Sequence, residues 1–194
     1  QQMCKKDKTP NRSLADFVAP AISDKKDFIG AFAVTAGAEV AKIANEYRDD
    51  QDDYSCIIIQ ALGDRLAEAY AEYLHEKVRI EWNYGINENL SIQDMIKEKY
   101  QGIRPAPGYP ACPEHSEKES LFKILNVTQK TGITLTENYA MSPAASVSGW
   151  LFSHPDSRYF GVGRLNQDQV EDYAARKKLQ LSQAAKLLQP NLTT

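Results

Sequence analysis

The stretch "DFIGAFAVTAG", Asp27 to Gly37, decides how the chain is organised. It is short, apolar and aromatic, and it is bracketed by glycines. These features favour a buried strand over a helix. The residues that follow, "AEVAKIANEYRDD" at 38–50, change to helical spacing. We therefore expect a strand that leads into a helix, in a domain of mixed helix and strand.

The longest predicted helix runs from Asp53 to about Trp82. Its apolar side chains fall three or four residues apart, at Ile57, Ala61, Leu62, Leu66, Ala69, Tyr73, Leu74 and Val78. This spacing predicts that these side chains form one buried helix face. Four charged side chains are expected to lie mostly off that face: Arg65, Glu72, Glu76 and Lys77.

Two further helices are predicted from serine caps. Ser91, with Asp94 three residues later, has the spacing of a capping box before a short helix that ends near Tyr100. Ser116, with Glu119 three residues later, has the same spacing before the run "SEKESLFKIL". The segment between these two helices is therefore expected to be a loop.

The C-terminal third alternates in polarity and is rich in threonine, valine and aromatic residues from 131 to 165. Such alternation is typical of strands. The turn "HPDS" at 154–157 predicts a hairpin, with Trp150 and Tyr159 on opposite arms. Two short helices are expected after residue 165. These elements together predict an α+β fold with an antiparallel sheet and flanking helices.

Composition limits the classes of function. The chain has 194 residues, of which 42% are hydrophobic and 25% charged, as expected for one globular domain. A formal net charge of −3 argues against nucleic-acid binding, because domains that neutralise phosphates carry a basic excess. Three cysteines are too few for a disulfide scaffold, and an odd number fits a reducing compartment such as the cytoplasm. No apolar run approaches the roughly 20 residues that span a bilayer, so we expect no membrane partner.

The loop "YQGIRPAPGYPACPEH", residues 100–115, concentrates conformational restriction. Pro105, Pro107 and Pro110 restrict their own backbone angles and those of the preceding residues, while Gly108 can adopt conformations that other residues avoid. Arg104 has a planar fork of donors suited to binding a carboxylate. We expect a stiff platform that loses little entropy when a ligand binds. The alternative is a surface turn with Arg104 in an ordinary salt bridge.

Other chemical signals are weak. Cys112 and His115 lie three residues apart, which is half of a zinc pattern, but the chain has no second pair at zinc spacing. We expect no metal site. The sequence also has no Ser, His and Asp arrangement that marks a hydrolase, and no glycine-rich phosphate loop after a strand.

Five stretches resemble the activation domain of cobalamin-dependent methionine synthase. They are "LADFVAP" (14–20), "ALGDRLAEAYAEYLHE" (61–76), "NENLS" (87–91), "GIRPAPGYPACPEH" (102–115) and "SVSGWLFSHPDSRYFGVG" (146–163). The resemblance runs from Leu14 to Leu192 and implies a twisted antiparallel sheet in a C-shaped or helmet-like domain. The family's domain is longer at its N-terminus, and an aspartate from that part holds the ligand. We therefore expect residues 1–194 to be the C-terminal major part of an activation domain.

The resemblance implies a site for S-adenosylmethionine, used to remethylate oxidised cobalamin after its reduction. The parent enzyme is a methyltransferase that moves a methyl group from methyltetrahydrofolate to homocysteine, with its primary catalysis in other domains. The implied partners are the cobalamin-binding domain of the same enzyme and a flavoprotein, either methionine synthase reductase or flavodoxin. The activation domain would align the methyl donor and supply no acid, base or nucleophile of its own. A pure docking domain for the flavoprotein, without ligand chemistry, is the alternative.

The same resemblance implies which residues bind the ligand: Arg104, Ala106, Gly108, Tyr109, Tyr159, Phe160, Glu68 and Glu98. Aromatic faces can stack on the purine and stabilise the sulfonium cation, although these side chains could also be ordinary core aromatics. The two glutamates could accept hydrogen bonds from the ligand's ammonium group or ribose hydroxyls. Their alternative is a solvated position on the surface.

Overall fold

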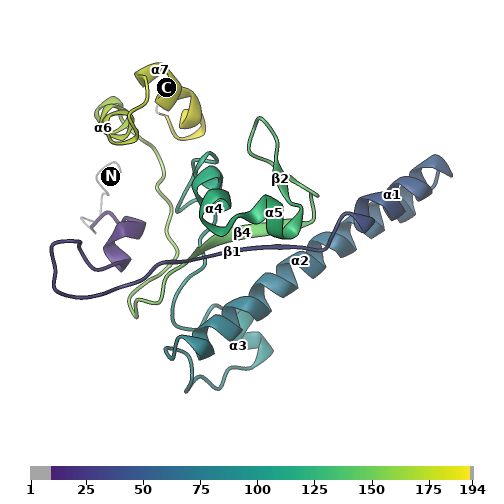
Figure 1. Cartoon of the computed structure of the whole chain (residues 1–194), viewed down its shortest axis with the longest axis horizontal. Coiled ribbons are helices and arrows are strands. Elements are labelled where there is room, and N and C mark those ends of the chain that lie inside the picture. Colours follow the sequence, from purple (N-terminus) through teal and green to yellow (C-terminus); the bar gives the residue numbers. More distant parts are fainter. Residues whose placement is uncertain (1–9, 193–194) are drawn as a thin grey trace.

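The computed structural model describes residues 10–192, so Cys4 lies outside the described residues (Figure 1). The elements in chain order are a 3-10 turn (Leu14–Phe17), β1 (Gly30–Thr35), α1 (Glu39–Asp49), α2 (Asp53–Glu81), α3 (Ile92–Ile96), α4 (Glu117–Leu125), α5 (Val127–Thr131), β2 (Thr134–Leu135), β3 (Met141–Ser142), β4 (Ser146–Leu151), α6 (Gln167–Lys177), α7 (Leu181–Leu187) and a second 3-10 turn (Gln189–Asn191). The α+β fold with antiparallel strands and flanking helices is confirmed.

The central sheet pairs β1 with β4, which are antiparallel although all of α1 to α5 lie between them in the sequence. Gly30 faces Leu151 at one end of this ladder, and Thr35 faces Ser146 at the other. The predicted hairpin through residues 154–157 is therefore wrong, since β4 pairs with β1 and Tyr159 lies in no strand. Alternation predicts that a segment is extended, but it does not choose the segment's partner. The smaller pair, β2 with β3, forms a hairpin in which Thr134 pairs with Ser142 and Leu135 pairs with Met141.

The two faces of the central sheet are covered by different helices. Phe32 and Val34 of β1 pack with Ala71 of α2, whereas Ala31 and Ala33 pack against the core of α4 and α5. Figure 1 shows the pair β1–β4 between these two helical layers. The alternation within β1 thus divides its side chains between two hydrophobic clusters.

The long helix α2 has the predicted bounds but a different buried face. It buries Cys56, Gly63, Ala67, Ala71, His75 and Arg79. Of the side chains predicted to be buried, Ile57, Ala61, Leu62, Leu66, Ala69 and Tyr73 are exposed, and only Leu74 and Val78 pack on the core. The reason is close approach: a Cβ on Gly63 would lie 2.5 Å from Val40 Cγ1 of α1. Small residues therefore occupy the inner face, and large ones are left outside.

Only one of the two predicted serine caps forms. Ser91 and Asp94 form the predicted capping box, but α3 ends at Ile96 and not near Tyr100. Ser116 precedes α4 without capping it, because its hydroxyl donates to the carboxylate of Glu114.

The C-terminal helices α6 and α7 are present as predicted, with a hydrophobic cluster of their own around Val170 and Ala184. In Figure 1 they lie apart from the central sheet. No helix within residues 10–192 combines the length and apolar character of a bilayer-spanning segment.

Candidate functional site

The proline-rich loop is anchored along β4. The N–H groups of Ile103 and Phe152 each donate to the other's carbonyl at 3.0 Å, and the Trp150 N–H donates to the Pro105 carbonyl at 2.9 Å. These bonds extend the sheet by a short irregular segment. They place Arg104 between two residues whose backbone is tied to the core.

A tight turn follows this anchored segment. The Gly108 N–H donates to the Cys112 carbonyl at 2.7 Å, and the Cys112 N–H donates to the Tyr109 carbonyl at 2.9 Å. Gly108 has a φ of +97°, and a Cβ there would lie 2.2 Å from Cε1 of His115. Both the backbone angle and the lack of space require glycine at this position.

A pocket of about 310 Å³ lies between this loop, α2 and the central sheet. Seven of the eight residues predicted to bind ligand line it: Glu68, Glu98, Arg104, Ala106, Tyr109, Tyr159 and Phe160. Gly108, the eighth, does not line the pocket; it shapes the turn that carries Tyr109. The pocket is also lined by five residues that were not predicted: Phe32, Pro105, Pro110, Ala111 and Val147. Phe32 and Val147 could be recognised as lining residues only once β1 and β4 were known to pair.

Arg104 is held at the pocket wall by three contacts. Its Nη2 lies 2.6 Å from Oε2 of Glu72, and its Nη1 donates to the Tyr100 hydroxyl at 2.8 Å. Its backbone N–H donates to the Tyr159 hydroxyl at 3.0 Å. The side chains of Arg104 and Glu72 are only 19% and 29% exposed, so this ion pair differs from the exposed salt bridge of the simpler alternative. Neither Glu72 nor Tyr100 was predicted to take part.

A buried layer supports Tyr100 from behind. The guanidinium of Arg79 lies 4.4 Å from the centre of the Tyr100 ring, and the ring of His75 meets it edge-on at 4.9 Å. Arg79 is itself paired with Glu88, with 2.8 Å between Nε and Oε2. Burial, followed by the charges of Arg79 and Arg104, lowers the pKa of His75 to about 3. The imidazole is therefore neutral at physiological pH and acts as packing.

Acidic side chains outnumber basic ones around the pocket. Glu68 and Glu98 line it together with Arg104, and Glu72 lies directly behind the arginine. Burial raises the pKa of Tyr159, so its hydroxyl is uncharged at neutral pH. Three carboxylates and one guanidinium suit a ligand that carries a net positive charge and one anionic group.

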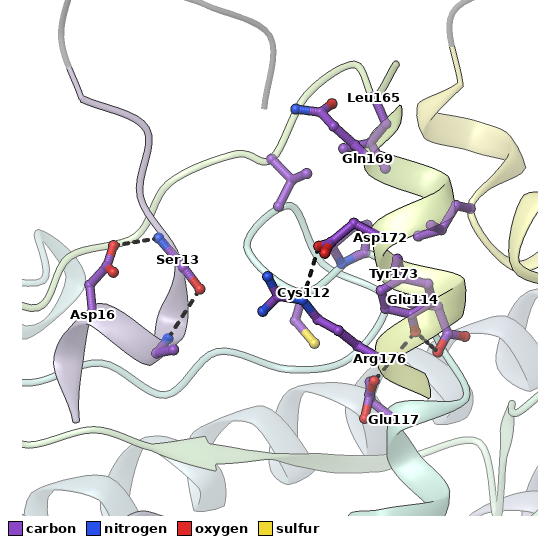
Figure 2. A pocket seen from close by; sticks show the side chains of 14 residues that line it. Ser13, Asp16, Cys112, Glu114, Glu117, Leu165, Gln169, Asp172, Tyr173 and Arg176 are labelled. Carbon is purple, nitrogen blue, oxygen red and sulfur yellow. Dashed lines mark hydrogen bonds and ion pairs between the residues drawn. The ribbon is translucent and has the colours of Figure 1, made fainter. Parts of the chain in front are cut away.

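A second pocket, of about 510 Å³, lies on the other side of the loop and is shown in Figure 2. Two ion pairs involve its lining residues: Arg176 pairs with Asp172 at 2.9 Å, and Glu117 pairs with Lys177 at 2.7 Å. Glu114 accepts a hydrogen bond from the Tyr173 hydroxyl at 3.1 Å. None of the eight predicted ligand residues lines it. The contacts of Tyr173 and Lys177 thus hold α6 against the end of the loop and the first turn of α4.

The half zinc pattern of the loop does not belong to a larger cluster. Within residues 10–192 no three His, Cys, Asp or Glu side chains are grouped so that they could hold a metal ion. Burial, with the charges of Glu117 and Glu114, raises the pKa of Cys112 to about 12. The thiol is therefore protonated at neutral pH and is a poor ligand and nucleophile.

Two comparisons with known proteins identify the family of the chain. The family described as "Vitamin B12 dependent methionine synthase, activation domain" matches residues 1–178. A crystal structure of the MetH reactivation domain bound to AdoHcy matches with a TM-score of 0.90 and 57% sequence identity. The match covers 93% of this chain and 56% of that chain, so the 194 residues span little more than half of that relative's length. The chain belongs to the activation-domain family of vitamin B12 dependent methionine synthases.

Proposed function

We propose that this chain binds S-adenosylmethionine in the pocket between the proline-rich loop and α2. The observation that carries the proposal is that seven of the eight predicted ligand residues, from four separate segments, line one pocket. The relative with 57% identity supports it, because that protein is bound to AdoHcy, the product that remains when S-adenosylmethionine loses its methyl group.

The chemistry of the pocket matches each part of this ligand. Arg104 is placed to bind the carboxylate of the amino-acid end, using guanidinium N–H groups that Glu72 and Tyr100 do not occupy. Glu68 and Glu98 favour the ammonium and sulfonium charges. The aromatic faces of the pocket suit the purine and the sulfonium. The volume also falls within the range of about 300–1,000 Å³ that is usual for small-molecule sites.

The role of these residues is positional. Reduced cobalamin, held by a neighbouring domain, would supply the nucleophile for the methyl group of the sulfonium, and S-adenosylhomocysteine would be the leaving group. The described residues around the pocket bind the donor, orient its methyl group outward and exclude competing conformations. We assign none of them as an acid, base or nucleophile, because an activated methyl donor and a strong nucleophile need only alignment.

The proposal extends to the whole enzyme and its partners. The partners are the cobalamin-binding domain of the same enzyme and a flavoprotein electron donor, methionine synthase reductase or flavodoxin. The whole enzyme, a cytoplasmic methyltransferase, would use this module to restore methylcobalamin, so that methyl transfer from methyltetrahydrofolate to homocysteine can resume. Family membership supports this assignment.

Isothermal titration calorimetry tests the binding step directly. S-adenosylmethionine and S-adenosylhomocysteine should each give saturable one-to-one binding to the 194-residue chain. The same titration is repeated on a longer activation domain, equal in length to the MetH relative. Arg104→Ala is then measured in both proteins. Absence of binding in both proteins would favour the docking-only alternative. Binding that is indifferent to Arg104→Ala would place the ligand in another pocket.

A further inference from the structure

The outward face of α2 carries a continuous apolar stripe. We define the α2 outer face as Ile58, Leu62, Leu66, Tyr70 and Tyr73, which are spaced four, four, four and three residues apart. Their exposed fractions are 42%, 54%, 64%, 51% and 58%. The rings of Tyr70 and Tyr73 stack with their centres 6.3 Å apart. Large apolar side chains thus follow one another along four turns of helix while remaining in solvent.

Charged residues are excluded from this face. At about 100° per residue, the sector of α2 that holds the outer face also contains Ser55, Ile59 and Ala69 between residues 55 and 73, and no Asp, Glu, Lys or Arg. The neighbouring charges, such as Arg65 and Glu68, lie outside it. A helix that faces water normally carries charges on its exposed side. The pattern of the α2 outer face is therefore that of a buried surface.

The rest of the described chain does not cover this face. The opposite side of α2 packs on the central sheet through Ala67, Ala71 and their neighbours, and α1 packs along it near Gly63. Contiguous apolar patches on a protein surface mark sites where another polypeptide packs. The α2 outer face therefore needs a partner beyond residues 10–192.

The MetH reactivation domain contains polypeptide that this chain does not match. The relative has the same fold at a TM-score of 0.90, but this chain covers only 56% of it, so the reactivation domain contains a large additional stretch of polypeptide. We propose that the α2 outer face is an interface inside the complete activation domain, and that its occupant is the polypeptide corresponding to the unmatched part of the relative. The occupant presents an apolar surface, with acceptors for the hydroxyls of Tyr70 and Tyr73.

This inference rests on exposure and on domain length, and it does not depend on ligand binding. The test is co-expression of the 194-residue chain with a separate, tagged polypeptide that comprises the unmatched part of the MetH reactivation domain. The two should co-purify as a one-to-one complex by light scattering. Leu62→Glu combined with Leu66→Glu should reduce the recovered complex at least tenfold, because two charges would be buried without partners. Ile124→Glu is the matched control, since Ile124 is 68% exposed on α4 and lies outside the face.

Three results would overturn the proposal. One is failure of the wild-type chain to co-purify when both polypeptides are soluble, and another is equal recovery of the double variant. The third is a dimer of the 194-residue chain that Leu62→Glu with Leu66→Glu converts to a monomer, which would make a second copy the occupant. Circular dichroism verifies that the variants keep their helix content. Hydroxyl-radical footprinting of the wild-type complex provides a readout without mutation, since Leu66, Tyr70 and Tyr73 should lose reactivity.

Discussion

Glu72 and Arg104 form a partly buried ion pair that joins the long helix to the proline-rich loop, with 2.6 Å between Oε2 and Nη2. Tyr100 adds a second contact to the same guanidinium. The side chain proposed to bind the ligand's carboxylate is therefore oriented before the ligand arrives. Such preorganisation lowers the entropy lost on binding.

Replacing Arg104 tests this arrangement. Arg104→Ala should weaken S-adenosylmethionine binding by about 2–4 kcal/mol, because it removes one partner of a desolvated charge pair. Arg104→Lys should restore only part of the affinity, since an ammonium group cannot reproduce the planar fork. Titration calorimetry measures both. Arg176→Ala is the control, because its ion pair with Asp172 is exposed and lines the other pocket; unchanged affinity in Arg104→Ala would exclude Arg104 from the site.

Tyr100→Phe separates the hydrogen bond from the packing. The variant loses the contact with Nη1 of Arg104 but keeps the ring's contacts with His75 and Arg79. We expect affinity for S-adenosylmethionine to fall by about 1 kcal/mol, with little change in the melting temperature. Tyr100→Ala should lower both. Equal affinities of wild type and Tyr100→Phe would show that the hydroxyl does not orient Arg104.

Gly108→Ala should be more harmful than a glycine substitution that meets only backbone strain. Gly132 also has a positive φ, of +77°, but a Cβ there would have no neighbour within 4 Å, whereas at Gly108 it would collide with His115. Gly132→Ala should cost about 1–2 kcal/mol of stability and leave ligand affinity unchanged. Gly108→Ala should cost more and also weaken binding, because the turn that carries Tyr109 must move. Urea unfolding and calorimetry measure the two effects, and similar results for both variants would contradict this account.

His75 should make the fold sensitive to acid. Its pKa is about 3 in the folded chain and about 6.5 when unfolded, so between these values the unfolded state binds more protons. The free energy of unfolding should therefore decrease as pH falls from 6.5 toward 3, by up to about 1.4 kcal/mol per pH unit from this residue. Urea unfolding at pH 7 and pH 5 should show a smaller loss for His75→Gln than for wild type. The same loss in both proteins would indicate that other groups, such as carboxylates, cause the dependence.

The elements of the fold were largely predictable from local sequence, but their packing was not. The bounds of α2 follow from the spacing of its apolar residues, and in the structure Asp52 caps its first turn. Its buried face could not be predicted from periodicity alone, because the helix has apolar residues on both sides. The close approach of α1 at Gly63 and of the central sheet at Ala71 decides that the small residues face inward. The pairing of β1 with β4 likewise depends on contacts between distant segments.

The residues of the site, like the elements of the fold, were predictable only in part. Arg104 was predicted because it lies within a conspicuous loop, and Tyr109, Glu68 and Tyr159 because of the family resemblance. Glu72 had been placed among the charges off the buried face, and Tyr100 had served only to mark the end of a helix. Glu72 reaches Arg104 because α2 crosses behind the loop, which no local pattern reveals, whereas Tyr100 contacts Arg104 from four residues earlier in the chain.

The length of α2 has one more consequence. A single uninterrupted helix, Asp53–Glu81, carries the α2 outer face near its middle and also carries Glu68 and Glu72 at the pocket. A polypeptide that settles on the outer face restrains the same rigid rod that positions Arg104 through Glu72. If packing of that polypeptide shifts α2 toward the position that the ligand requires, assembly of the domain and binding of the methyl donor are thermodynamically linked, and each strengthens the other by the same factor. A saturating methyl donor should then tighten the association of the two polypeptides.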